Sequence, residues 1–170
     1  FISENAKELD RADGIIFPGV GHAGAAMDDL RSRDLDVWLK CTKKPVLGIC
    51  LGMQLLYESS EEGETQTLGI IPGRLKKFDS SKAKVPHMGW NQIAIRKDAP
   101  IFRGIEDGSS FYFVHSYYVV PDDPAVVATE TEYGVTFCSS IWRDNVMATQ
   151  FHPEKSQTLG LQILKNFGDL

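Results

Sequence analysis

The sequence predicts an α/β fold, and two observations support this. In the first third of the chain, Gly14–Phe17 and Pro45–Ile49 are continuous apolar runs, as expected of strands covered on both faces. Each run is followed by a helical pattern, and this alternation implies parallel strands joined by right-handed crossovers. After Ser59 the pattern changes to short apolar segments separated by proline and glycine, which favours further strands joined by turns.

Three segments have the pattern of amphipathic helices. Ala25–Lys40 spaces Met27, Leu30, Val37 and Trp38 among polar residues, and Leu51–Glu58 follows the second strand. Ser156–Phe167 carries apolar residues at i, i+4 and i+8, which predicts a closing helix packed on the sheet.

The remaining apolar segments predict strands, and no repeat or break in composition marks a second domain. We therefore expect one domain over residues 1–170. The acidic stretch Glu58–Glu64 predicts a solvated loop, and Arg143–Asn145 a hairpin turn. The later strands are expected at Gly69–Phe78, Gln92–Arg96, Ser110–Pro121, Ala125–Glu130, Val135–Trp142 and Val146–Phe151.

Composition narrows the class of protein. The 170 residues are 42% hydrophobic and 24% charged, and the net charge of −5 argues against nucleic acid or an anionic membrane as the main partner. No apolar run approaches the ~20 residues of a membrane-spanning helix. Three cysteines without C-x-x-C spacing and four scattered histidines predict no metal site and a reducing cytoplasm. We expect no cofactor.

The segment Gly48–Gly52 has the form G-x-C-x-G between a predicted strand and a predicted helix. This is the context of a nucleophile elbow, in which glycines let the chain turn sharply and expose the central side chain. At a helix N-terminus, Cys50 would feel the positive end of the helix dipole, which favours the thiolate. The backbone N–H of Leu51 would point toward a developing oxyanion. Cys41 and Cys138 lack such surroundings, and for them we expect only a packing role.

A base for this thiol is predicted in Phe151–Glu154, which follows the last strand. In an extended segment residues i and i+2 project to the same side, so Glu154 can reach one ring nitrogen of His152 and leave the other for the sulfur. Together, Cys50, His152 and Glu154 form a candidate Cys-His-Glu triad.

The segment Gly19–Gly24 spells G-x-G-x-x-G after an apolar strand, which is also the pattern of a dinucleotide-binding turn. That interpretation requires an acidic residue about 20 positions later to hold the ribose. Leu39–Lys44 offers no carboxylate, so we disfavour it.

The stretches G-I-C-L-G-M-Q and Q-F-H-P-E-K-S resemble the class I (triad) glutamine amidotransferases. Three further stretches narrow the resemblance to the glutaminase subunits of imidazole glycerol phosphate synthases: Pro18–Gly21, Val85–Asn91 and Phe111–Tyr118. It implies a flavodoxin-like, three-layer fold with a mixed, largely parallel central sheet and an added antiparallel portion. Members also begin with a strand and a helix, roughly 30 residues, before the position of Phe1.

The resemblance implies roles for individual residues. Cys50, His152 and Glu154 would hydrolyse glutamine to glutamate and ammonia, which passes to a (β/α)8-barrel cyclase subunit in a 1:1 heterodimer. The oxyanion hole would comprise Leu51, Gly19, Val20 and Gly21. Glutamine would be bound by Gly21, Gln54, Ser116 and Tyr117, and the cyclase by His87, Met88, Trp90, Asn91 and Tyr112.

Three alternatives remain open at this point. A paralogous glutaminase could supply another synthase, such as one that amidates a surface sugar, and only the partner would differ. A stand-alone γ-glutamyl cysteine hydrolase would be fully active alone and would give Pro86–Asn91 no role. A catalytically silent scaffold would not need the intact triad.

Overall fold

The computed structural model describes residues 1–170 and contains a ten-stranded main sheet. Its centre consists of β1 (Ile15–Gly19), β2 (Val46–Cys50) and β12 (Val146–Thr149), which are parallel and hydrogen-bonded in that order. Beyond β12 the neighbours are antiparallel, in the order β11 (Thr136–Arg143), β9 (Tyr117–Pro121) and β5 (Gly73–Lys77).

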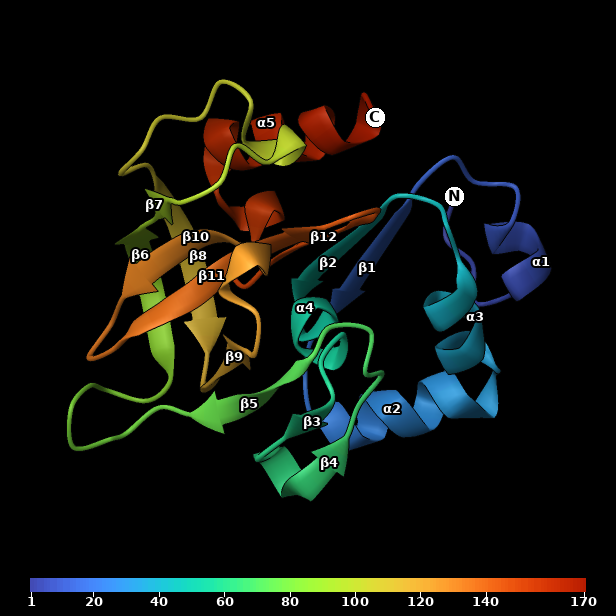
Figure 1. The fold of residues 1–170 in the computed structure, drawn as a ribbon, viewed down its shortest axis with the longest axis horizontal. Coiled ribbons are helices and arrows are strands. Elements are labelled where there is room, and N and C mark those ends of the chain that lie inside the picture. The colour runs from blue at the N-terminus through green and yellow to red at the C-terminus, as the bar shows by residue number, and fades with distance from the viewer.

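Short strands complete the main sheet, and a separate two-stranded sheet lies beside it (Figure 1). The short strands are β3 (Ser59–Ser60), β4 (Thr65–Gln66), β7 (Ala94–Ile95) and β10 (Val127–Glu132). The second sheet pairs β6 (His87–Gln92) with β8 (Ser110–His115) in antiparallel register. Single 3-10 turns occur at Glu62–Glu64, Pro100–Phe102, Pro124–Val126 and Pro153–Lys155.

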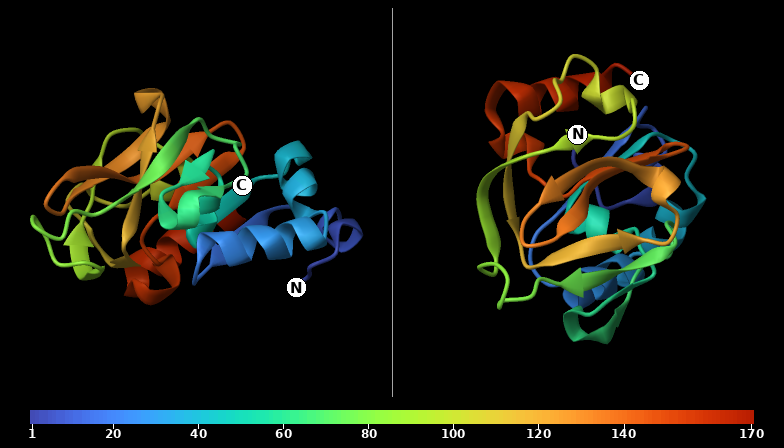
Figure 2. Two further views of the ribbon diagram at one scale, coloured as in Figure 1. Left: turned by 90° about the horizontal axis from the view of Figure 1, so that it is seen from below. Right: turned by 60° about the vertical axis from the view of Figure 1, so that its left-hand side comes forward.

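Helices cover both faces of the parallel strands, so the molecule has three layers (Figures 1 and 2). Successive strand side chains point to opposite faces. Ala148 packs in the core beneath α2, α3 and α4, whereas Met147 and Leu47 pack in the core beneath α5. The helices are α1 (Ala6–Leu9), α2 (Ala23–Ser32), α3 (Leu35–Cys41), α4 (Leu51–Leu55) and α5 (Gln157–Gly168).

The expected α/β fold with a mixed sheet is confirmed, and its antiparallel portion is larger than expected. Parallel pairing is confined to β1, β2 and β12 and to the short β3–β5 pair. The closing helix and the turn at Arg143–Asn145 lie where the sequence placed them. The other predicted strands shift by a few residues at their ends.

The single helix predicted at Ala25–Lys40 is wrong, because the chain breaks there into α2 and α3. Asp34 adopts a left-handed conformation with φ of 58° between them. One turn beyond the buried Leu30, a continuous helix would carry the charged Arg33 and Asp34 into the core. The break instead lets Leu35 return to the core.

The second helix also ends earlier than predicted, at Leu55 rather than Glu58. Backbone N–H groups of residues 68–71 bind the carbonyls of Leu55, Leu56 and Tyr57, which satisfies the end of the helix from outside it. Expecting a purely solvated loop at Glu58–Glu64 was also wrong, since β3 and a 3-10 turn form there.

The strand predicted at Ser110–Pro121 is two strands in different sheets. β8 ends at His115, and after Ser116 the chain enters the main sheet as β9. The strand predicted at Gln92–Arg96 is confirmed only as the short β7 at Ala94–Ile95, which pairs with β10. The longer β6 before it, which pairs with β8, was not predicted.

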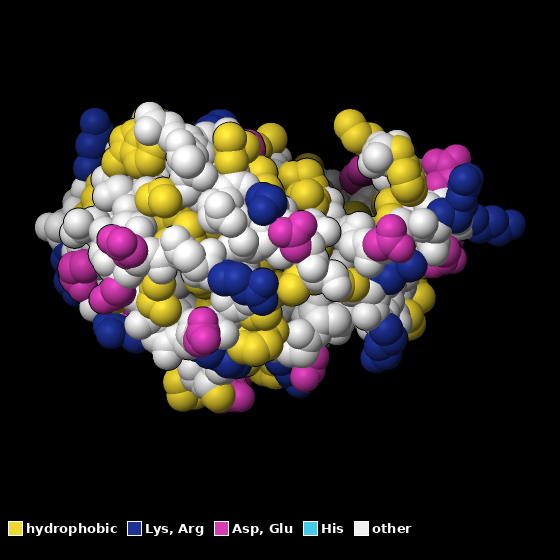
Figure 3. Space-filling model, turned by 90° about the horizontal axis from the view of Figure 1, so that it is seen from above, with side chains coloured by type: hydrophobic (Ala, Val, Ile, Leu, Met, Phe, Trp, Pro, Cys, Tyr) yellow, Lys and Arg dark blue, Asp and Glu magenta, His cyan; other side chains and the backbone are white.

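The surface seen from the α5 side carries charges of both signs, interspersed rather than gathered in a patch of one sign (Figure 3). None of the helices is both long enough and apolar enough to cross a lipid bilayer.

The helix after β2 lies against the backbone of β1 at Gly52. A Cβ atom at this position would overlap the carbonyl oxygen of Phe17, which belongs to a strand hydrogen-bonded to β2 and has no room to withdraw. Only glycine therefore permits this approach.

We expect Gly52→Ala to lower the free energy of unfolding by about 3 kcal/mol, because the added methyl group meets backbone rather than a movable side chain. Urea denaturation monitored by circular dichroism measures this. Gly168→Ala, where nothing lies within 4 Å of the added atom, serves as the control and should not destabilise the protein. Equal stability of the two variants would contradict the prediction.

Candidate active site

The turn that carries Cys50 is strained in the way a nucleophile elbow requires. Cys50 has φ of 53° and ψ of −109°, a conformation that costs a non-glycine residue about 1–3 kcal/mol. A Cβ at Gly48 would lie 3.0 Å from the backbone nitrogen of Met53 and 3.1 Å from the Cβ of Ala148. The tight turn thus needs glycine on both sides of Cys50, since Gly52 is equally constrained.

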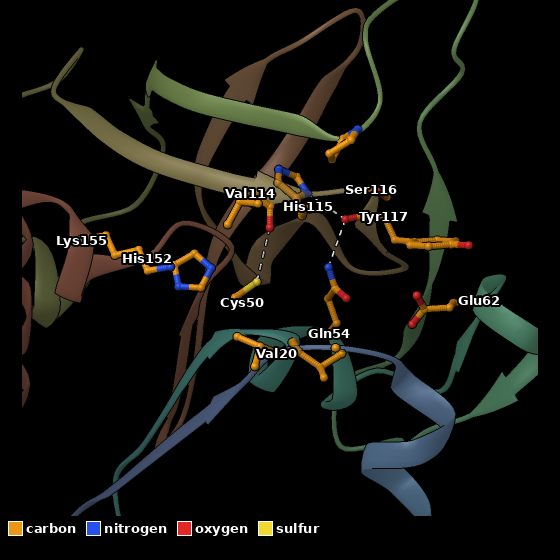
Figure 4. A pocket seen from close by; sticks show the side chains of 13 residues that line it. Val20, Cys50, Gln54, Glu62, Val114, His115, Ser116, Tyr117, His152 and Lys155 are labelled. Carbon is orange, nitrogen blue, oxygen red and sulfur yellow. Dashed lines mark hydrogen bonds between the residues drawn. The ribbon is translucent and has the colours of Figure 1, made fainter.

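Cys50 opens into a cavity of about 340 Å³ at the carboxyl ends of the parallel strands (Figure 4). In Figure 4, His152 lies to one side of the sulfur, and Gln54 and Tyr117 lie to the other. The cavity is lined by Val20, Gly21, Cys50, Leu51, Gln54, Glu62, Pro86, Val114, His115, Ser116, Tyr117, His152 and Lys155.

His152 reaches the cavity from the end of β12, the strand that pairs with β2. Its Nδ1 lies 2.7 Å from Oε1 of Glu154, as the i, i+2 spacing predicted. The ring is almost fully buried, and its Nε2 has no hydrogen-bond partner within the protein. A carboxylate on Nδ1 places the proton there, so Nε2 presents a free lone pair to the cavity.

The thiol of Cys50 is neutral in the free protein. Burial raises its pKa to about 11, and this outweighs the backbone N–H of Leu51, which lowers the pKa. We expected the helix dipole to favour the thiolate, but α4 has only five residues and the sulfur lies out of water. The nearest acceptor of the thiol is the carbonyl oxygen of Val114, at 3.8 Å.

The predicted oxyanion loop follows β1, and Gly19 lies opposite Cys50 in the β1–β2 register. Val20 is 79% exposed, and Gly21 has φ of 95°, which favours glycine. Both residues line the cavity. Their backbone groups are close to the nucleophile, and the oxyanion role remains a prediction.

The helix that follows this loop does not offer an anion site of the dinucleotide-binding kind. The N–H of Ala23 donates to Oε2 of Glu62 at 2.7 Å, and the N–H of Gly24 donates to Nδ1 of His22 at 3.1 Å. A carboxylate thus occupies the N-terminus where a pyrophosphate would bind, which argues against the dinucleotide interpretation.

The predicted glutamine-binding residues lie together around the cavity. Gln54 sits one turn after Cys50, and its Nε2 donates to the Tyr117 carbonyl and to Oε1 of Gln150, both at 3.0 Å. Only its Oε1 is left to accept a hydrogen bond from a ligand. Ser116, at the break between β8 and β9, also faces this space.

Four further polar residues belong to the site and were not predicted: Glu62, His115, Gln150 and Lys155. Gln150 is fully buried, and its Nε2 lies 3.8 Å from Sγ of Cys50. The i, i+2 rule that linked His152 to Glu154 also relates Gln150 to His152, so this signal was present in the sequence.

The residues predicted to face a partner lie on β6 and β8 but do not all point outward. Met88 and Trp90 are 61% and 50% exposed, and Trp90 packs edge-on against Tyr112. His87 is buried between Phe113 and Tyr133, so its side chain cannot touch a partner directly. Asn91 is half-buried and points toward His87.

Comparison with known proteins shows to which family the chain belongs. The sequence model described as "Glutamine amidotransferase class-I" matches residues 2–169. The chain belongs to this family. It is 52% identical to "Imidazole glycerol phosphate synthase subunit HisH" of Syntrophotalea carbinolica, over 99% of this chain and 87% of that protein. The protein of the same name from Methanocaldococcus jannaschii is 51% identical, over 99% and 86%.

Solved structures of other proteins share this fold at low sequence identity. A glutamine amidotransferase crystal structure gives a TM-score of 0.70 at 16% identity, covering 98% of this chain and 85% of that one. The structure of PurLQS from Thermotoga maritima gives 0.67 at 19%, covering 95% and 81%. The expected class I amidotransferase fold is thereby confirmed.

We expect the alkylation rate of Cys50 by iodoacetamide to rise about tenfold per pH unit from pH 7 to pH 10, because the thiolate fraction grows until the pH reaches the pKa of about 11. Mass spectrometry of the peptide that contains Cys50 measures the rate. The exposed Cys41 is first replaced by alanine, and the buried Cys138 on the same map reports any unfolding. A plateau below pH 9 would refute the neutral thiol.

Proposed function

We propose that this amidotransferase is the glutaminase subunit of an imidazole glycerol phosphate synthase, with Cys50, His152 and Glu154 as its catalytic triad. The observation that carries the proposal is the placement of the sulfur and of an unpartnered imidazole nitrogen in one cavity, at the ends of two paired strands. The relatives that bear this synthase's name match nearly the whole chain at about half identity.

The reaction begins with a proton transfer, since the thiol is neutral. The free Nε2 of His152 takes the thiol proton as Sγ attacks the side-chain amide carbon of glutamine. The resulting oxyanion is held by the N–H of Leu51 and by the loop at Gly19–Gly21. Glu154 stabilises the imidazolium through Nδ1.

The intermediate then collapses and the carbon–nitrogen bond breaks. His152 returns its proton to the departing nitrogen, which leaves as ammonia, and a γ-glutamyl thioester remains on Cys50. A water molecule, deprotonated by the same Nε2, attacks the thioester carbon. Glutamate leaves, and the proton returns to the sulfur.

The outer face of β6 and β8 is suited to binding a partner subunit. Met88, Trp90 and Tyr112 form an apolar surface there, and large exposed aromatic side chains are typical anchors of protein interfaces. We propose that this surface binds the (β/α)8-barrel cyclase in a 1:1 heterodimer. His87 and Asn91 would act behind it, because His87 is buried.

The exposed apolar surface at Met88 and Trp90 favours a partner-dependent glutaminase, since a stand-alone hydrolase would give this surface no role. A paralogous glutaminase for another synthase has the same chemistry and differs in the subunit it binds. Assays with a defined partner separate these candidates.

The deciding experiment measures glutamate release from glutamine by the chain alone, with the cyclase, and with the cyclase plus its phosphoribosyl-linked substrate. Cys50→Ala provides the blank and should release no glutamate. We expect strong stimulation only in the complete mixture. High activity of the chain alone would indicate a hydrolase, and a failure of the cyclase to stimulate it would indicate a different synthase.

We expect Trp90→Ala to weaken cyclase binding about 30-fold or more, the effect of losing an interface anchor worth about 2 kcal/mol. Isothermal titration calorimetry with the cyclase measures the dissociation constant. Val37→Ala, at a side chain 57% exposed on α3, is the matched control and should bind normally. Unchanged binding by Trp90→Ala would place the interface elsewhere.

A further inference from the structure

Gln150 is a fully buried polar residue that the mechanism above does not use. It follows β12 directly, and its backbone N–H donates to the carbonyl of Ser139 at 2.8 Å. Its side chain lies between Gln54 and the sulfur of Cys50. The donors and acceptors of a buried amide each need a hydrogen-bond partner. The partners of the Gln150 amide therefore show which of its ends faces the sulfur.

The orientation of the Gln150 amide follows from a neighbouring carbonyl oxygen, which can only accept hydrogen bonds. The carbonyl oxygen of Tyr117 lies 3.0 Å from Gln54, so the nearer end of the Gln54 amide must be its NH2 group. The second hydrogen of that group points to Gln150, whose nearer atom is therefore the acceptor Oε1. The NH2 group of Gln150 is left facing Sγ of Cys50 at 3.8 Å.

The carbonyl oxygen of Tyr117 also accepts a hydrogen bond from His115, and from there a second series of hydrogen bonds extends to β6. His115 Nδ1 lies 2.8 Å from the Tyr117 oxygen and must carry its proton there. Its Nε2 then accepts from Nδ1 of His87 at 3.0 Å. The remaining nitrogen of His87 accepts from Nδ2 of Asn91 at 3.3 Å, and Asn91 also donates to the carbonyl of Glu132.

These contacts form one continuous series, which we call the buried hydrogen-bond chain. It runs from Asn91 on β6 to Cys50 through His87, His115, the Tyr117 carbonyl, Gln54 and Gln150. Every bond in it has one permitted direction, so no amide in it can rotate without breaking two bonds.

We propose that Gln150 is a further catalytic residue, whose amide N–H donates to the sulfur of Cys50 when His152 has taken the thiol proton, and that the buried hydrogen-bond chain holds it in that orientation. This rests on the proposed function, since it adds a residue to the same site. A hydrogen bond to a charged acceptor is about twice as strong as one to a neutral acceptor, so this donor stabilises the thiolate more than the thiol. The N–H of Gln150 thus acts together with the N–H of Leu51: Gln150 follows β12, and Leu51 follows the neighbouring strand β2.

The test is the rate and pH profile of Cys50 alkylation by iodoacetamide in the full chain carrying Gln150→Met. Methionine has a similar volume but no N–H, so the thiolate loses one donor. We expect the alkylation rate at pH 8 to fall about tenfold and its pH profile to move up by about one unit. In the complete synthase mixture kcat should fall with it, with KM for glutamine within about threefold. A residue that only fills space would leave the pH profile unchanged.

Two further variants keep the test decisive. Gln162→Met on α5 makes the same substitution away from the cavity and should match the parent protein. His87→Phe keeps an aromatic ring between Phe113 and Tyr133 but breaks the buried hydrogen-bond chain, and should slow alkylation about threefold by loosening the amide.

Two results would overturn the proposed role of Gln150. A folded Gln150→Met protein whose Cys50 reacts at the parent rate would overturn the proposal. Should thermal melting show that this variant is unfolded, an unchanged rate in His87→Phe would overturn it instead. Because alkylation needs neither glutamine nor cyclase, this result does not depend on whether the cyclase stimulates glutamate release.

Discussion

The close approach of Gly52 to the carbonyl of Phe17 determines the geometry of the site. It lets α4 start directly over β1, and the chain can meet that requirement only by turning sharply at Cys50, whose φ is positive. The same turn directs the N–H of Leu51 toward the sulfur and puts Gln54 one helical turn away. One backbone contact thus positions the proposed nucleophile, the proposed oxyanion donor and the Gln54 amide together.

The groups that contact the sulfur of Cys50 are neutral and are held by directional bonds. Burial raises the pKa of Cys50 to about 11 and lowers the pKa of His87 to about 4 and that of His115 to about 3. Near neutral pH these rings and the thiol therefore carry no charge, and each imidazole keeps one donor and one acceptor. In the proposed mechanism the thiol becomes charged when His152 takes its proton, and the donors around the sulfur then become most effective.

The sequence was informative where the pattern is local. The elbow at Gly48–Gly52 and the spacing of His152 and Glu154 depend on residues within five positions. The structure has the strained turn at Cys50 and the contact between His152 and Glu154 that those patterns implied. The passage from β8 to β9 at Ser116 could not be predicted, because an unbroken aromatic run does not reveal a change of sheet. Gln150 was missed although it lies two residues before His152, because its side-chain partners Cys50 and Gln54 are distant in sequence and only the fold brings them together.

The pairing of β2 with β12 also determines how the site would fail on heating. Cys50 ends one of these strands and His152 follows the other, so the two side chains can separate only if the central, doubly covered part of the sheet opens. Such strands exchange their amide hydrogens only through global unfolding, whereas exposed turns open locally. Glu154, 46% exposed on a 3-10 turn, belongs to the second class. The proposed nucleophile and base would therefore stay in register until the whole domain unfolds, and the part of the proposed triad that opens first is the carboxylate of Glu154.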